Sequence, residues 1–296
     1  MKRPSAKKPI VSGRVRKPAK KPSARKRPGA KEPGFDDNGR RYSDISTFWN
    51  SVEEHWYGKV ATYWSNEEPS NDGVLGGLSE THEPDLATSR RFLEALRRLQ
   101  TPPAFDHVVD CGAGVGRVTE ALLLGSFENL DLVEPCKPLL AEAMKRLKGR
   151  QNVRFLSQPL QDWDPPRGRY SVIWLQWVLL HLTDKDFVGL LSRCRDCLRP
   201  KGVICVKDNL APRSGWLADL QDHSIARTER MYKRLFAEAG LRIELEMRQT
   251  DWPKGVLDVK IFALRPADQK VGGGSISDQR FGLRCPGCVP SNRPCL

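Results

Sequence analysis

A glycine-rich segment carries the clearest chemical signal in the sequence. Residues 108–117 (VVDCGAGVGR) form an apolar stretch that ends in Asp110, followed by glycines at positions 112, 114 and 116. Such glycines let a backbone approach a bound ligand closely before a helix begins. The G-x-G-x-G spacing differs from the G-x-G-x-x-G of dinucleotide-binding folds, and a purely structural tight turn is the alternative interpretation.

A second acid strengthens the case for a ligand. Glu134 follows Asp110 by 24 positions, at the end of a predicted strand over 129–134, where the ribose of a nucleoside would lie across the strand ends. A carboxylate can accept both hydroxyl protons of a ribose, whereas the alternative is an ordinary surface acid. The segment lacks a pyrophosphate clamp, because Arg117 is alone and no G-x-x-x-x-G-K-S/T loop occurs. A nucleoside with a short charged arm, such as S-adenosylmethionine, therefore fits better than a dinucleotide.

Alternating strand and helix patterns must position these residues. Strands are predicted at 107–110, 129–134, 153–156, 172–177, 202–207, 242–247 and 258–264, and helices at 118–124, 138–147, 184–198 and 224–239. Before them, apolar residues at three- or four-residue steps from Trp49 to Trp64 predict an amphipathic helix, and a second helix is expected to begin at Thr88 or Ser89. The alternation predicts an α/β fold with a parallel sheet and helices on both faces.

Charge is concentrated at the N-terminus. The chain has a formal charge of +13, of which residues 1–33 carry +12 and residues 34–296 only +1. Because residues 1–41 lack apolar periodicity and repeat Lys-Pro and Arg-Pro pairs, they are predicted to be disordered. The basic run at 20–27 indicates a nuclear import signal or a polyanion-binding arm, with a merely solvated tail as the alternative. No stretch reaches the roughly 18 apolar residues of a membrane span.

The cysteines fall into two groups. Five lie inside periodic segments and are interpreted as reduced core thiols: Cys111, Cys136, Cys194, Cys197 and Cys205. The other three, Cys285, Cys288 and Cys295, follow a Gly-Gly-Gly linker in a tail that is predicted to be flexible. Structural zinc needs four converging ligands, and the tail offers only three cysteines. No metal site is therefore expected.

Together the motifs resemble the protein alpha-N-terminal methyltransferases. The resemblance rests on DCGAGVGR at 110–117, LQD at 160–162, VIWLQWV at 172–178, HLTD at 181–184 and VKDN at 206–209, and extends over about 48–265. It implies a seven-stranded, Rossmann-like class I methyltransferase that uses S-adenosyl-L-methionine. Its implied substrates are proteins that expose N-terminal X-Pro-Lys or X-Pro-Arg after loss of Met, whose alpha-amino group becomes mono-, di- or trimethylated.

The resemblance also implies the site residues. Those for the cofactor are Gly112, Gly114, Arg117, Glu134, Pro135, Cys136, Leu160, Gln161 and Gln176. The implied catalytic residues are Asp222 and His181, which would remove protons, and Asn209, which would hydrogen-bond the start of the substrate. Those for the peptide are Trp64, Gly76, Trp177, Asp219 and Ser224. Leu220 departs from the family pattern, because an acid often stands there beside Asp219.

The chemistry suits an N-terminal amine. A terminal amine has a reference pKa of about 7.7–8, so part of it is neutral near pH 7, unlike a lysine amine near 10.4. Attack on a sulfonium methyl needs that lone pair held in line, so positioning is the main task, together with proton removal.

Plainer interpretations of single residues stay open. His181 could be a satisfied histidine at a helix entry, Asp222 a cap for the predicted helix over 224–239, and the two tryptophans core aromatics.

Two other functions are possible. A nucleic-acid methyltransferase could use the basic arm, but the D/N/S-P-P-Y/F motif of amino-methylating DNA enzymes is missing where Leu175, Gln176 and Trp177 stand. A non-catalytic reader of N-termini would not need the glycine turn and Glu134.

The expected organisation has four regions. These are a disordered basic tail at 1–41, a helical cover at 42–104 within the catalytic domain, the cofactor-binding core at 105–265 and a flexible tail at 266–296. The expected location is the nucleus and cytoplasm. Protein N-termini, and a nuclear import receptor or a polyanion bound through residues 1–33, are the expected partners.

Overall fold

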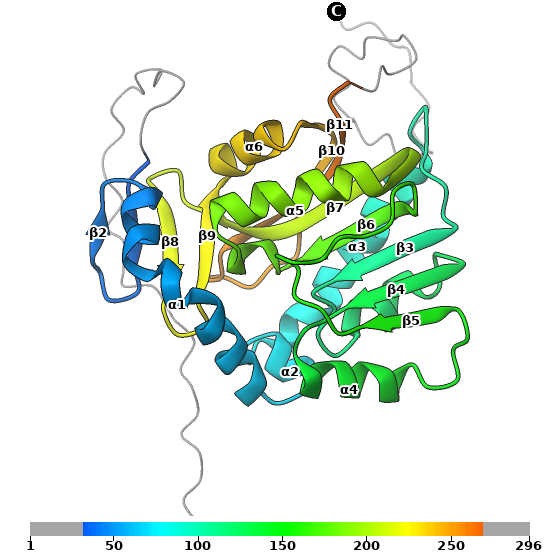
Figure 1. Cartoon of the computed structure of the whole chain (residues 1–296), viewed down its shortest axis with the longest axis horizontal. Coiled ribbons are helices and arrows are strands. Elements are labelled where there is room, and N and C mark those ends of the chain that lie inside the picture. The colour runs from blue at the N-terminus through cyan, green and yellow to red at the C-terminus, as the bar shows by residue number, and fades with distance from the viewer. Residues whose placement is uncertain (1–31, 269–296) are drawn as a thin grey trace, which may run out of the picture.

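The computed structural model describes residues 32–268 (Figure 1). The predictions for residues 1–31 and 269–296 lie outside this range. Within it, the seven predicted strands form one sheet in the order β5-β4-β3-β6-β7-β11-β10. Their bounds are β3 (His107–Cys111), β4 (Asn129–Val133), β5 (Val153–Leu156), β6 (Tyr170–Gln176), β7 (Leu198–Ala211), β10 (Leu241–Arg248) and β11 (Asp258–Pro266).

The strands β3 to β7 run parallel, and β11 lies antiparallel between β7 and β10. The carboxyl ends of the parallel strands therefore meet at one edge of the sheet, where α/β folds bind their ligands. This arrangement confirms the predicted α/β class.

Helices cover both faces of the sheet. On one face α5 (Asp184–Cys197) and α6 (Glu229–Glu238) share a core with Val109, and on the other α3 (His82–Arg97) shares a core with Val108. Neighbouring residues of β3 thus face opposite layers, as the two-residue period of a strand requires. The remaining helices are α1 (Ile45–Asn66), α2 (Asn71–Val74), α4 (Lys137–Arg146), the 3-10 helices η1 (Ser79–Thr81) and η3 (Leu179–His181), and the π-helix η2 (Thr119–Leu123).

The N-terminal cover is built mainly by α1. The carboxylate of Asp44 caps it by accepting from the backbone N–H of Thr47 at 3.0 Å. The helix crosses the carboxyl ends of the strands and reaches the neighbourhood of α2 and α4 (Figure 1). No helix among residues 32–268 is long and apolar enough to span a bilayer.

Residues 32–41 are ordered, so the prediction of a disordered tail up to residue 41 was wrong for them. They contain the strand β1 (Gly34–Asp36), which forms a hairpin with β2 (Arg41–Tyr42) and pairs in parallel with β8 (Trp216–Asp219). Burial of the Trp216 indole against Gly34 holds the hairpin in place, and the indole N–H donates to the Glu32 carbonyl at 3.1 Å. Trp216 is far from Gly34 in the sequence, so the local residue pattern could not predict that residues 32–41 are ordered.

Two predicted helix starts were also wrong. The segment over 224–239 begins as a strand, β9 (Ser224–Thr228), and α6 starts only at Glu229, capped by the Thr228 hydroxyl. Pairing with β8 makes the first part extended. Asp222 therefore does not cap a helix. The helix α3 begins at His82, so Ser89 and Thr88 lie buried inside it.

Candidate active site

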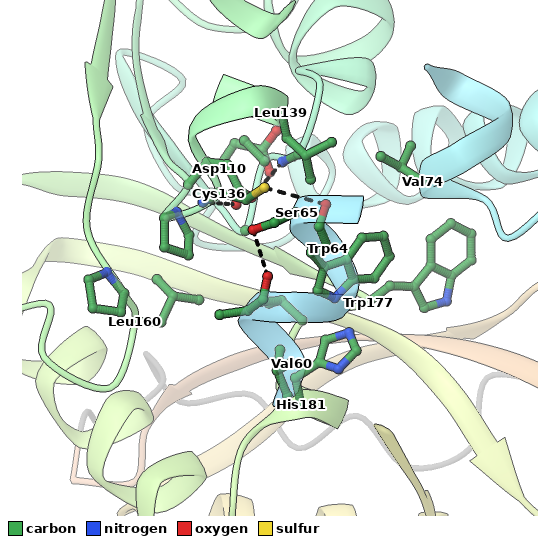
Figure 2. A pocket seen from close by; sticks show the side chains of 18 of the residues that line it. Val60, Trp64, Ser65, Val74, Asp110, Cys136, Leu139, Leu160, Trp177 and His181 are labelled. Atoms are coloured by element: carbon green, nitrogen blue, oxygen red, sulfur yellow. Dashed lines mark hydrogen bonds between the residues drawn. The ribbon is translucent and has the colours of Figure 1, made fainter. Parts of the chain in front are cut away.

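A cavity of about 520 Å³ lies where β3, β4 and β6 end beneath α1 (Figure 2). Its size falls within the range of small-molecule sites. Twelve of the residues predicted from the sequence line it together: Trp64, Gly112, Gly114, Arg117, Glu134, Pro135, Cys136, Leu160, Gln161, Gln176, Trp177 and His181. Trp64, Trp177 and His181 gather on one side, and Cys136 and Leu160 lie toward the other (Figure 2).

The glycine turn forms one wall. Gly112, Gly114 and Gly116 all have positive φ, at 69°, 55° and 75°, a conformation that disfavours residues with a Cβ atom. At Gly112 a Cβ would also lie 2.4 Å from a methyl carbon of Val178, which follows β6. The turn therefore requires glycine for both its backbone conformation and its packing.

Glu134 joins two loops at the cavity. One carboxylate oxygen accepts from the backbone N–H of Gly114 at 2.9 Å, and the other from that of Cys136 at 2.8 Å. Burial raises the pKa of Glu134 to about 7. Each oxygen keeps a lone pair, so the carboxylate can still accept from a ligand hydroxyl.

Arg117 is a cation of the cavity wall that is almost fully buried. Its guanidinium lies 2.8 Å from a carboxylate oxygen of Asp85 and 5.6 Å from the Trp177 ring. Asp85 also receives hydrogen bonds from Gln176 and Lys207. Sequence reasoning missed Asp85 and Lys207, although a lysine within the apolar run GVICVK is itself an unusual signal.

His181 sits at the end of η3, and its ring lies perpendicular to that of Trp64 at a centroid distance of 5.6 Å. Its Nδ1 lies 3.0 Å from the backbone carbonyl oxygen of His223. A carbonyl can only accept, so Nδ1 carries the proton, and Nε2 of the neutral ring keeps a lone pair. Burial lowers the pKa of His181 to about 4, which favours this neutral form.

Trp177 turns the chain at the end of β6. It has a φ of 52°, which is unusual for a bulky residue, and its indole N–H is buried without a hydrogen-bond partner among residues 32–268. Backbone strain of this kind gathers at functional sites. Trp177 is thus not an ordinary core tryptophan.

Five predicted site residues do not line the cavity: Asn209, Gly76, Asp219, Asp222 and Ser224. Gly76 lies in the turn after α2, and Asn209 is in β7, where it pairs with Val259 of β11. Asp219 ends β8, Ser224 begins β9 and pairs with it, and Asp222 lies in the turn between the two strands.

Asp222 precedes His223, whose carbonyl holds His181. Burial and the nearby charge of Asp219 raise the pKa of Asp222 to about 7. One carboxylate oxygen of Asp222 is buried and has no hydrogen-bond partner in the described part of the chain.

The hairpin adds a carboxylate that sequence reasoning missed. Asp37, between β1 and β2, accepts a hydrogen bond from the backbone N–H of Leu220 at 3.2 Å. Its charge also contributes to the raised pKa of Asp222. Asp37 thus places a carboxylate beside Leu220. No local signal could have located it, since 183 positions separate the two residues.

Residues 44–265 match the model of a family described as AdoMet dependent proline di-methyltransferase. The chain belongs to this family of alpha N-terminal protein methyltransferases. It is 36% identical over 249 residues to alpha N-terminal protein methyltransferase 1 of Arabidopsis thaliana, covering 78% of this chain and 90% of the relative. It is 39% identical over 216 residues to N-terminal Xaa-Pro-Lys N-methyltransferase 1 of Mus musculus, covering 72% and 96%.

A solved structure agrees with the family assignment. A SAM-dependent methyltransferase of Leishmania major superimposes with a TM-score of 0.76 at 33% identity, covering 83% of this chain and 100% of that one. The predicted class I fold, the enzyme class and S-adenosylmethionine as cofactor are thereby confirmed. The protein is an S-adenosylmethionine-dependent methyltransferase of protein N-termini.

The cavity residues of this methyltransferase fit that cofactor. Arg117 offers a cation, and Lys207 compensates the Asp85 carboxylate that contacts it, so an anionic group can be accommodated beside Arg117. Glu134 offers acceptors suited to hydroxyl groups, and Leu160 offers an apolar surface. These are the three kinds of contact that a nucleoside with an amino-acid arm requires.

Proposed function

We propose that this methyltransferase acts on proteins that expose X-Pro-Lys or X-Pro-Arg after Met removal and transfers up to three methyl groups to the terminal amine. A terminal proline, with one replaceable proton fewer, would stop at two. The observation that carries the proposal is a cofactor-type cavity that adjoins three carboxylates, Asp37, Asp219 and Asp222, which have no cationic partner among residues 32–268. The mouse relative, whose name specifies Xaa-Pro-Lys, supports the same substrate class.

The proposed cofactor contacts follow from the donors and acceptors in the wall. Arg117 would bind the methionine carboxylate, and Glu134, Pro135 and Cys136 would surround the ribose. Leu160 and Gln161 would flank the adenine, with Gln176 beneath the methionine arm and the turn at Gly112 and Gly114 close to the cofactor. When bound, the cofactor supplies a methyl group on a positively charged sulfur.

The proposed proton acceptors are His181 and Asp222. A terminal amine must lose its proton before each transfer, because an ammonium has no lone pair. The Nε2 atom of His181 keeps a lone pair, since its Nδ1 proton is engaged by His223. Asp222, with a pKa of about 7, can alternate between its two protonation states near neutral pH.

Aromatic groups support the binding of a cationic terminus. Trp64 and Trp177 both line the cavity beside His181, and an aromatic face attracts an ammonium through its quadrupole. Asn209, Ser224 and Gly76 stay proposed peptide contacts from the family resemblance, at the margin of the cavity.

Three neighbouring carboxylates, Asp37, Asp219 and Asp222, support the proposal that the third residue of the substrate is basic. Among residues 32–268, no Lys or Arg forms an ion pair with Asp37, Asp219 or Asp222, so their negative charge is left to an incoming partner. Carboxylates pair readily with Lys or Arg. Asp37 would provide the carboxylate that Leu220 does not.

The location is proposed from charge alone. Residues 1–33 carry +12, which suits recognition by an import receptor or association with a polyanion, and we place the protein in the nucleus and cytoplasm. A fluorescent fusion lacking residues 1–31 should lose its nuclear fraction. An unchanged distribution would refute the proposed role of the arm.

Methyl transfer from labelled S-adenosylmethionine tests the substrate. The full chain is incubated with a Ser-Pro-Lys peptide, its N-acetylated twin, a Ser-Pro-Gln peptide and a duplex oligonucleotide. Label is expected on the first peptide, at its terminal nitrogen by mass spectrometry, and less on the Gln peptide. Label on the acetylated twin or on the duplex alone would overturn the proposal, and peptide binding without transfer would favour a reader of N-termini.

A further inference from the structure

Three charged side chains are buried together behind the cavity wall. The side chains of Asp85, Lys207 and Arg117 are 0%, 1% and 5% exposed. Asp85 comes from α3, Lys207 from β7, and Arg117 from the turn after β3. Of the three, Arg117 alone lines the cavity. Burying charged groups costs free energy of desolvation unless each charge is paired. The two cations and one carboxylate of this group therefore need a physical reason.

Asp85 is the centre of the group. One carboxylate oxygen forms an ion pair with the Arg117 guanidinium at 2.8 Å, and the other accepts a hydrogen bond from the ammonium of Lys207. The amide nitrogen of Gln176 lies 2.9 and 3.0 Å from the two oxygens. The amide oxygen of Gln176 accepts from the indole N–H of Trp174 at 3.1 Å, so its orientation is defined at both ends. Asp85 therefore holds two residues of the cavity wall.

Lys207 is turned entirely toward α3. Besides the Asp85 carboxylate, its ammonium donates to the Asp85 carbonyl oxygen and the Ser89 hydroxyl, each at 2.9 Å. These three acceptors use all three of its protons. Lys207 consequently cannot bind a ligand in the cavity, and its contribution there must act through Asp85.

The charges of the group do not balance. Two cations face one carboxylate. Burial lowers the pKa of Lys207, but the Asp85 carboxylate opposes this shift and favours the charged ammonium. Burial and the charge of Arg117 lower the pKa of the neighbouring His82 and favour its neutral form. Among Asp85, Lys207 and Arg117 a net charge of plus one unit remains, and Arg117 carries it to the cavity. A further carboxylate, Asp110, acts on Arg117 through its charge and accepts its own hydrogen bond from the Thr119 hydroxyl at 2.7 Å. If Lys207 were neutral, Asp85 would cancel Arg117 and would repel a carboxylate brought close to it.

We propose that Asp85 and Lys207 are positioning residues of the cofactor site. Asp85 anchors Arg117 and Gln176, and Lys207 compensates Asp85, so that Arg117 offers an uncancelled positive charge to the methionine carboxylate. The inference rests on the proposed placement of that carboxylate at Arg117. The inference adds two residues to the cofactor contacts proposed above, because neither Asp85 nor Lys207 lines the cavity.

Ligand binding by the full chain tests this arrangement without methyl transfer. Calorimetry compares S-adenosylhomocysteine with its decarboxylated analogue, which differs only in lacking the carboxylate. The ratio of the two dissociation constants measures the preference for the carboxylate. In Asp85→Asn and in Lys207→Met this preference should fall about 10- to 100-fold, the range for a lost hydrogen bond to a charged group, with analogue binding within about twofold of wild type.

Matched variants separate positioning from stability. Asp131 is a second buried carboxylate with two arginine partners, Arg154 and Arg169, none of which lines the cavity. Asp131→Asn should lower thermal stability and leave the preference unchanged. Lys207→Arg, which keeps the charge, should retain more of the preference than Lys207→Met.

A double variant keeps the test valid if a single variant of Asp85 or Lys207 does not fold. Removing both members of a buried ion pair is tolerated better than removing one, so Asp85→Asn/Lys207→Met should fold. Its preference should lie between those of wild type and Lys207→Met, because Arg117 is again uncancelled but has lost its anchor. A wild-type preference in the double variant, or in Asp85→Asn, would overturn the inference.

Arg117→Met separates the inference from the placement on which it rests. This variant should lose the preference as well. If it keeps the preference, the placement of the carboxylate at Arg117 is wrong. If it loses the preference while Asp85→Asn and Lys207→Met keep it, the placement stands and the positioning roles do not.

Discussion

The backbone carbonyl oxygen of His223 lies 3.0 Å from Nδ1 of His181. This contact joins η3 to the turn between β8 and β9, where His223 has a φ of 56°. The Trp56 indole N–H adds a second constraint from α1, because it donates to the carbonyl oxygen of His181 at 2.8 Å. The helix α1, η3 and the turn between β8 and β9 are thus connected at His181.

Replacing this histidine should remove the proton acceptor while keeping its anchor. In His181→Asn, the amide nitrogen can still donate to His223, but no atom replaces Nε2. We expect kcat for a Ser-Pro-Lys peptide to fall about 100-fold or more, the range of general base catalysis. The affinity for S-adenosylhomocysteine should stay within about threefold. The exposed His55→Asn serves as the control, and a kcat within twofold of wild type would exclude His181 from proton transfer.

Asp222→Asn should separate turnover from cofactor binding. Asp222 does not line the cavity, so calorimetry should give an unchanged dissociation constant for S-adenosylhomocysteine. We expect kcat to fall at least about 100-fold, because the amide cannot accept the proton. Unchanged turnover would remove Asp222 from the mechanism.

The pH dependence of kcat/KM should change when the negative charge of Asp219 beside Asp222 is removed. Because burial and Asp219 raise its pKa to about 7, kcat/KM of wild type should fall as pH drops through that value. Asp219→Asn removes a neighbouring negative charge, which lowers the pKa of Asp222 and moves the acidic limb to lower pH. The peptide amine titrates near pH 8 with both enzymes, so its contribution cancels in the comparison. A limb that stays in place or moves upward would contradict this assignment.

Asp37 should affect substrates with a basic third residue. We expect Asp37→Asn to raise KM for a Ser-Pro-Lys peptide about two- to fivefold, the effect of a lost exposed ion pair, and to leave KM for Ser-Pro-Gln unchanged. Glu94→Gln on α3 controls for the loss of one surface charge. Equal effects on the two peptides would show that Asp37 does not contact the third residue.

Gly34 should be essential for the hairpin. An added Cβ would lie 2.0 Å from the Trp216 ring, so Gly34→Ala should lower the free energy of unfolding by about 1–3 kcal/mol in urea titrations. The control is Gly58→Ala in α1, where an added Cβ meets nothing within 4 Å and should be neutral or stabilising. Equal stability of the two variants would mean that β1 contributes little to the fold.

The features that sequence reasoning located correctly are local ones. The glycine turn can be identified because three nearby glycines with positive φ and a strand end define it within eight residues. The alternation of strands and helices likewise depends on neighbouring residues. Helix starts were less predictable, because pairing with β8 converts 224–228 into a strand.

The sequence by itself determined the fold class, the glycine turn and Glu134, and so the cofactor, since strand ends and turns place those residues regardless of distant partners. The other residues of the cavity wall followed from the resemblance of its motifs to the family. The tertiary structure decided how residues 32–41 are ordered, how Asp37 reaches the turn between β8 and β9 and how Asp85 holds Arg117. The physical reason is distance along the chain. Lys207 and Asp85 meet across 122 positions, and a buried charge selects its partner only after the sheet and its covering helices have packed.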